Sequence, residues 1–154
     1  MQIGDRELTE EEEIYKENIL DHYKHPRNTG TLPECTVHHH EHNPLCGDRI
    51  EIFLTFTDET CTDAKFVGQG CAISQASMSM LSEQLKGKTV DDIKRITSDD
   101  ILSLLGIPVG IVRIKCALLS LKTVHVGISH WENFTNSATT SPHSVKFTET
   151  GELP

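Results

Sequence analysis

Three cysteines and one aspartate are the residues of this chain whose types and spacing could do chemistry. Two of the cysteines stand beside glycines, where the backbone can approach an ion closely. The aspartate follows the first cysteine at Cys-x-Asp spacing and adds a hard oxygen ligand to soft thiolates, a mixture unusual for a purely structural zinc site. The set could form disulfides, bind a metal or act as reactive thiols, and we favour metal or sulfur chemistry. The four residues are Cys46, Asp48, Cys71 and Cys116.

The neighbours of the first two cysteines favour a reactive site. Gly47 gives the loop of Cys46 freedom to turn, and Cys46 is the site residue most able to swing away from a bound metal. We therefore choose Cys46 as the candidate persulfide acceptor. Cys71 follows Gly70 and is expected to begin a helix, where free N–H groups and the helix dipole favour a thiolate.

Two cations precede the third cysteine. Arg113 and Lys115 stand three residues and one residue before Cys116, and we expect both charges to favour its thiolate. With Asp48, the three thiolates would offer three sulfurs and one oxygen. Such a set suits tetrahedral Zn²⁺, Fe²⁺ or an iron–sulfur cluster.

Length and charge exclude several function classes. A chain of 154 residues is expected to form one domain, and a formal net charge of −9 argues against nucleic acid and anionic membranes as partners. The acidic, polar N-terminus resembles no secretory signal, so we expect a cytoplasmic protein. Reducing conditions there disfavour disulfides, and five cysteines leave at least one unpaired.

The first half of the chain predicts one helix and three strands. A capping box at residues 9–12 begins the helix, which ends before Pro26. Strands are expected at residues 36–42, 49–57 and 61–67, the second with alternating apolar residues. In an antiparallel meander, the loop after the first strand and the segment after the third lie at one end. That arrangement would bring Cys46 and Cys71 together.

Helices are expected from Cys71 onward. The first is closed by Gly87, Thr89 and Ser98 are the predicted N-caps of two short helices, and the last helix runs from about residue 111 to Trp131. The order predicts an α+β fold, with a small three-stranded antiparallel sheet and helices packed on one face.

Domain boundaries follow from the same patterns. Residues 1–10 are expected to be a flexible N-terminus, 11–131 a single scaffold domain, and 132–154 a mobile, Ser/Thr-rich tail.

Three motifs together resemble the iron–sulfur cluster assembly scaffolds of the NifU N-terminal domain/IscU-like family, whose fold is called SufE/NifU-like. They read Asn-Pro-Leu-Cys-Gly-Asp at 43–48, Gly-Gln-Gly-Cys-Ala-Ile-Ser at 68–74 and Arg-Ile-Lys-Cys-Ala at 113–117. Residues 19–28 are similar to the family's first helix and its exit. The resemblance covers about residues 11–130.

The resemblance implies the ligands and partners of the site. Cys46, Asp48, Cys71 and Cys116 would hold zinc, Fe²⁺ or a transient [2Fe–2S] cluster. The partners would be a pyridoxal-phosphate cysteine desulfurase that delivers sulfur, and apo iron–sulfur proteins or carrier proteins that receive the cluster.

The chain combines features of two branches of the family. Lys115 stands where many IscU-type members carry a histidine, and this Arg-x-Lys-Cys pattern is similar to the zinc-binding SufU branch. The 45-position step from Cys71 to Cys116 is too short for the insertion of roughly twenty residues typical of SufU, and so resembles IscU. Residues 106–110 lack the Leu-Pro-Pro-Val-Lys run that dedicated Hsp70-type chaperones read, so handling by such a chaperone is not expected.

Three functions remain open on these residues. The favoured one is a scaffold that accepts sulfur and iron, assembles a [2Fe–2S] cluster and transfers it, without turnover of its own. The second is a zinc-dependent sulfur acceptor of a cysteine desulfurase, similar to a sulfurtransferase. The third is a zinc-stabilised interaction domain.

The remaining cysteines and histidines are assigned no role in the site. Cys35 and Cys61 have no motif around them, and we interpret both as incidental. The run at residues 38–42 would place alternate histidines on one face of an edge strand, most simply a solvated face. His42 stands closest to the 43–48 loop and is the histidine expected to reach the site. The run contains His38, His39, His40 and His42.

Overall fold

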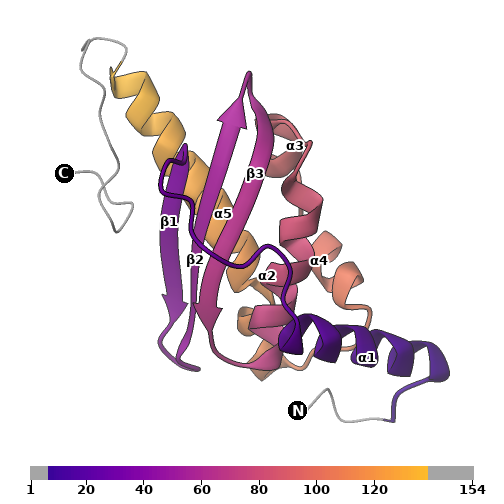
Figure 1. Cartoon of the computed structure of the whole chain (residues 1–154). Coiled ribbons are helices and arrows are strands. Elements are labelled where there is room, and N and C mark those ends of the chain that lie inside the picture. The colour runs from indigo at the N-terminus through magenta and orange to yellow at the C-terminus, as the bar shows by residue number, and fades with distance from the viewer. Residues whose placement is uncertain (1–6, 139–154) are drawn as a thin grey trace.

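The computed structural model describes residues 7–138, which form an α+β fold in the order α-β-β-β-α-α-α-α (Figure 1). This order confirms the predicted fold class. The elements are α1 (Glu10–Lys24), β1 (Val37–Asn43), β2 (Asp48–Thr57), β3 (Thr60–Gln69), α2 (Ala72–Leu85), α3 (Val90–Lys94), α4 (Ser98–Leu105) and α5 (Ile111–Ala138).

The sheet is an antiparallel meander in the order β1-β2-β3. Asn43 at the end of β1 pairs with Asp48 at the start of β2, and Arg49 pairs with Gln69 at the end of β3. The β1–β2 loop and the segment that leads into α2 therefore lie at the same end of the sheet. This is the arrangement that the sequence predicts for the two loops that carry cysteines.

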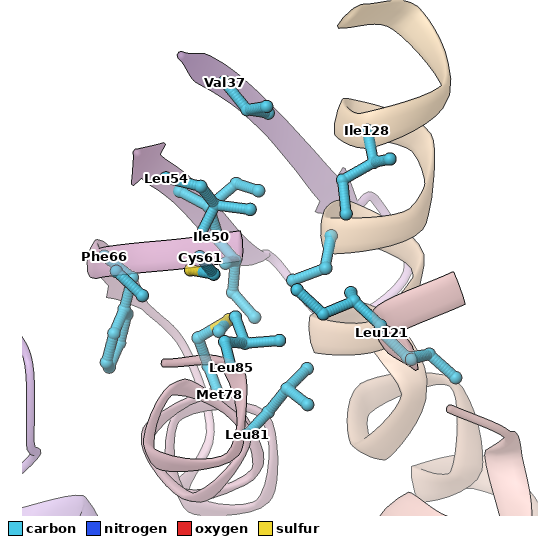
Figure 2. Close-up of a cluster of buried hydrophobic side chains, with 14 of the residues drawn as sticks. Val37, Ile50, Leu54, Cys61, Phe66, Met78, Leu81, Leu85, Leu121 and Ile128 are labelled. Carbon is cyan, nitrogen blue, oxygen red and sulfur yellow. The ribbon is translucent and has the colours of Figure 1, made fainter. Parts of the chain in front are cut away.

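Helices α2 and α5 cover one face of the sheet and form the main core with it (Figures 1 and 2). Alternate residues of β2 point into this core, as expected for a strand with one buried face. Gly127 lets α5 pack closely on the sheet, because a Cβ atom there would lie 3.0 Å from Cβ of His39 and 3.2 Å from Cγ1 of Val37. The core side chains drawn in Figure 2 include Ile50, Leu54, Phe66, Met78, Leu81, Leu85, Leu121 and Ile128.

The opposite face of the sheet is less open than the sequence suggests. The segment between α1 and β1 crosses this face (Figure 1), and its residues Asn28 and Gly30 exchange backbone hydrogen bonds with Phe66 of β3. Phe53 on this face is buried and stacks on the His38 ring, with 4.5 Å between ring centroids. The alternation of apolar residues in β2 predicts only the burial of the face that packs on α2 and α5.

Helix α1 packs on α2 and closes a second core cluster, which contains Cys116. Its predicted N-terminal capping box is confirmed, with Thr9 as N-cap and reciprocal bonds to Glu12. Gly106 ends α4 at φ +71°, and a Cβ atom there would lie 2.2 Å from Cδ1 of Tyr15 in α1. The close contact of α4 with α1 thus requires glycine.

Two predicted helix boundaries are wrong. The N-cap of α4 is Thr97, whose hydroxyl accepts from the Asp100 N–H, whereas Ser98 is the first helical residue. Helix α5 continues seven residues beyond Trp131, because that ring stacks on Phe56 at 5.2 Å between centroids and keeps the helix against the sheet. The tail expected from residue 132 is thus helical to Ala138, and its remainder, 139–154, lies outside the described residues, as do residues 1–6.

The longest helix, α5, is not a candidate membrane span. Within residues 7–138, no helix is both long enough and apolar enough to span a bilayer.

Candidate metal and sulfur centre

The loop between β1 and β2 presents the first cysteine at the end of the sheet. The N–H groups of Cys46 and Gly47 donate to the carbonyl oxygen of Asn43 at 3.2 and 2.8 Å. Oδ1 of Asn43 also accepts from the Leu45 N–H at 3.2 Å. Gly47 has φ +73°, a left-handed conformation that glycine adopts without strain. This short loop leaves Cys46 exposed.

The aspartate of the motif is fully buried and is held by the start of α2. Oδ1 of Asp48 accepts from the Cys71 N–H at 2.8 Å, while Oδ2 lies 4.0 Å from the Cys71 Sγ. Cys71 is the N-cap of α2, as its predicted helix start requires. Gly70 makes the contact feasible, because a Cβ atom there would lie 2.2 Å from Oδ1 of Asp48. One carboxylate oxygen is thus anchored and the other faces the thiols.

The third cysteine approaches from the second turn of α5. Cys116 is fully buried, and its Sγ lies 3.3 Å from the Sγ of Cys46. Ligand atoms of Cys46, Asp48 and Cys116 all lie within 4.8 Å of one another. A tetrahedral site with Zn–S bonds of about 2.3 Å has S–S edges of about 3.8 Å. The residues therefore fit a tetrahedral metal site, and the five cysteines of the chain are free thiols.

Burial, and not the neighbouring cations, dominates the charge state of Cys116. Its pKa is raised, first by burial and then by contacts with Asp48 and Cys46. The cations expected to favour the Cys116 thiolate are therefore outweighed by burial, and the net effect on its pKa in the metal-free protein is upward. A deprotonated thiol at this depth needs a cation in direct contact.

Arg113 supplies one such cation. Its pKa is raised, first by the charge of Cys71 and also by side-chain contacts with Cys116 and Cys71. The guanidinium thus faces two of the thiols. Lys115 is exposed and lies instead beside His42 at a neighbouring hollow. The sequence predicted two supporting cations, and the structure brings only Arg113 to the thiols.

The histidine run does not join the site. Among the described residues, the only cluster of three ligand-type side chains is that of the two cysteines and Asp48. The His38 ring contacts the Glu51 carboxylate, and His39, on the opposite face, is buried with Nε2 2.6 Å from Glu41. His42 is exposed and lines the hollow next to the site.

The two incidental cysteines lie away from the centre. Cys61 is buried in the main core, where burial raises the pKa of its thiol to about 11. The half-buried Cys35 also has a raised pKa, for the same reason. Both thiols are poor nucleophiles at neutral pH.

Asn43 is the residue that sequence reasoning passed over. Its motif predicts no role for it, although its side chain and carbonyl organise the loop of Cys46. The available signal was Asn-Pro at the start of a turn, a pair that favours turn initiation.

Fold and geometry together define the class: a small α+β protein in which two thiols and one carboxylate cluster at one end of the sheet, with the Cys71 Sγ 4.0 Å from that carboxylate. Residues 14–138 match the family described as "NifU-like N terminal domain". The chain belongs to this family.

Two relatives are similar over most of their length. The zinc-dependent sulfurtransferase SufU of Bacillus subtilis is 38% identical over 136 residues, covering 77% of this chain and 92% of the relative. The iron–sulfur cluster assembly scaffold protein IscU of Rickettsia prowazekii is 34% identical over 127 residues, with the same two coverages.

Two solved structures are similar to this one in fold. The structure of a putative iron–sulfur cluster assembly scaffold protein for the SUF system from Fervidobacterium islandicum has a TM-score of 0.63 and 28% identity, and covers 75% of this chain and 97% of that one. A NifU-like N-terminal structure from Brucella abortus, at a TM-score of 0.65 and 24% identity over 79% of this chain and 96% of its own, shows the same fold.

Proposed function

We propose that the chain is an iron–sulfur cluster assembly scaffold. It accepts sulfur from a cysteine desulfurase, combines it with iron, holds a transient [2Fe–2S] cluster as cargo and releases it to apo-proteins. Family membership supports this proposal, since relatives at 30% identity or more include several proteins named as IscU scaffolds. The proposed ligands are Cys46, Asp48, Cys71 and Cys116.

The observation that carries the proposal is a cluster at the end of the sheet in which one thiol is exposed. Ligand atoms of Cys46, Asp48 and Cys116 lie within 4.8 Å of one another, and the Cys71 Sγ lies 4.0 Å from Oδ2 of Asp48. Asp48 and Cys116 are fully buried and Cys71 is half-buried, whereas Cys46 stands on a short loop open to solvent. We assign sulfur acceptance to Cys46. Its thiolate can attack the outer sulfur of a desulfurase persulfide while the other three residues stay in place.

The donor set also suits release of the cargo. A carboxylate oxygen binds iron less strongly than a thiolate does, so Asp48 makes the fourth position the weakest. Oδ1 of Asp48 is already engaged by the Cys71 N–H, which leaves Oδ2 for a metal. The buried thiol of Cys116 would thus retain the cargo, while Asp48 would be the ligand that exchanges most readily.

A zinc-dependent sulfur acceptor is the second candidate, and the SufU relative at 38% identity favours it. The 3.3 Å separation of the Cys46 and Cys116 sulfurs is about 0.5 Å shorter than the edge of a zinc tetrahedron, so a small outward movement of the exposed Cys46 would admit the ion. Zn²⁺ bound to these residues would keep their thiols deprotonated. In this function Cys46 would leave the metal to take the persulfide sulfur, and no cluster would form.

Anaerobic purification with elemental analysis, followed by reconstitution with ferrous iron, a desulfurase, cysteine and a reductant that converts persulfide sulfur to sulfide, separates the two functions. The scaffold develops cluster absorbance and then activates an apo-ferredoxin. A protein that keeps zinc, shows no cluster absorbance and still accelerates the desulfurase is the sulfur acceptor instead.

Matched variants test whether the proposed ligands are responsible. Cys116→Ser should abolish both cluster formation and desulfurase stimulation, whereas Cys35→Ser, which changes a thiol outside the site, should leave both intact. If Cys116→Ser keeps both activities, the centre has only a structural role, and the chain is better described as a zinc-stabilised interaction domain.

A further inference from the structure

A hollow of about 420 Å³ adjoins the proposed sulfur site. Its walls come from residues 42–45, which lead directly into Cys46, and from α5, where Lys115 directly precedes Cys116. Leu118 and Leu119 form its apolar floor. The volume is within the range of small-molecule pockets, which run from about 300 to 1,000 Å³.

The charge of this hollow is opposite to that of the molecule. Lys115 and Lys122 line it together with His42, and no carboxylate is among its lining residues. Two other hollows of comparable size both have carboxylates in their lining, although one of them also contains Lys88 and Arg95. Glu41 lies 3.7 Å from Lys122, but its carboxylate is shared with His39. In a chain of net charge −9, this is a local site for an anion.

A buried amide points to the same conclusion. Asn43 lines the hollow, is only 8% exposed, and its Nδ2 has no hydrogen-bond partner. The orientation of the amide is fixed, because Oδ1 accepts from the Leu45 N–H. A buried donor without a partner costs free energy, and because Nδ2 is itself out of reach of solvent, an acceptor in the hollow recovers that cost only when the 43–45 loop shifts to open it.

We propose that this hollow binds a small thiol that carries carboxylate groups, and that this thiol takes sulfur from Cys46. The inference rests on the proposed function for the source of the sulfur. The lysines hold the carboxylates, the leucines cover the carbon chain, and the Asn43 N–H becomes available where the loop yields to the ligand. The thiol end then lies beside the loop of Cys46.

The transfer needs no further reactant. The thiolate of the bound molecule attacks the outer sulfur of a Cys46 persulfide, and a new S–S bond forms on the ligand. The S–S bond at Cys46 breaks, Cys46 leaves as a thiolate, and the proton stays on the transferred sulfur. One persulfide is exchanged for another, so nothing is oxidised or reduced overall.

Binding is tested first, without any desulfurase. S-methylglutathione, an unreactive thioether with two carboxylates, is titrated into the ¹⁵N-labelled protein. We expect amide shifts at His42, Leu45 and Leu118. Lys122→Gln should weaken binding about threefold, the size of one exposed charge pair. Lys94→Gln is the matched control, because Lys94 is an exposed lysine that also pairs with a glutamate, Glu132, on a distant surface.

Sulfur transfer is tested second, on protein whose Cys46 has been converted to a persulfide. At equal thiolate concentrations, glutathione should remove the sulfur faster than neutral 2-mercaptoethanol, and Lys122→Gln should slow glutathione alone. Absence of shifts at the hollow, equal weakening by Lys94→Gln, or equal rates for the two thiols would overturn the proposal. Because binding is measured without cluster assembly, failure of the scaffold function leaves this first result intact.

Discussion

Replacement of Gly70 by alanine should damage the centre although it changes none of the proposed ligands. Gly70 has φ +144°, where an L side chain costs about 1–3 kcal/mol. The new Cβ atom would also lie 2.2 Å from Oδ1 and 2.9 Å from Cα of Asp48. Asp48 must therefore move and lose its charged hydrogen bond to the Cys71 N–H, a further loss of about 1.5–3 kcal/mol. We expect the free energy of unfolding to fall by about 3–5 kcal/mol.

The same displacement should weaken metal binding. Residues that orient a ligand typically contribute a factor of about 10–100 in metal affinity. We expect the zinc affinity of Gly70→Ala to fall within that range. Competition with a chromophoric chelator measures it, and urea unfolding of the metal-free protein measures the stability.

Gly87→Ala is the matched control. Gly87 also has a positive φ, +88°, but a Cβ atom there meets nothing within 4 Å. Only backbone strain of about 1–2 kcal/mol is expected, with unchanged zinc affinity. If the two variants lose the same stability and both keep their zinc affinity, the close packing of Gly70 on Asp48 does not govern the site.

Three further predictions follow from the same structure. Burial lowers the pKa of His39 from 6.5, so the unfolded chain binds the proton more tightly than the folded protein does. The free energy of unfolding should therefore fall as the pH drops below about 6.5. In urea titrations, His39→Gln should reduce this slope by up to about 1.4 kcal/mol per pH unit, and an unchanged slope would refute the assignment. Chelation of bound metal should speed hydrogen exchange in residues 43–48 and 68–71, and identical exchange with and without metal would rule out coupling to the loops. Thr97→Ala should cost about 1 kcal/mol in thermal unfolding and Ser98→Ala clearly less, since Thr97 holds the cap; the reverse order would show that Ser98 is the cap.

The fold could be predicted because local signals agreed along the chain. The capping box at Thr9, the alternation in β2 and the N-cap Thr89 each specify one element end or face with little help from distant contacts. Antiparallel pairing then places the two cysteine loops at one end, which is a topological consequence of three consecutive strands. These features need no knowledge of packing.

The errors arise where tertiary contacts decide. The end of α5 depends on stacking of Trp131 on Phe56, a contact across the fold that no periodicity reveals. The pKa of Cys116 depends on its depth, and sequence neighbours such as Lys115 say nothing of depth. Arg113 reaches the thiols because it lies one turn before Cys116, whereas Lys115 turns about 100° away from Cys116 along the helix surface.

The length of α5 has a practical consequence. Cys116 and Ala138 lie 22 positions apart on one continuous helix, which corresponds to about 33 Å along its axis. Figure 1 shows that the far end of α5 points away from α1. A fluorophore attached near position 138 would therefore sit well outside contact range of the thiols. Energy transfer from this fluorophore to a chromophoric metal at the centre would report the distance between them. A change in that distance while cargo is loaded and released would show that the helix bends.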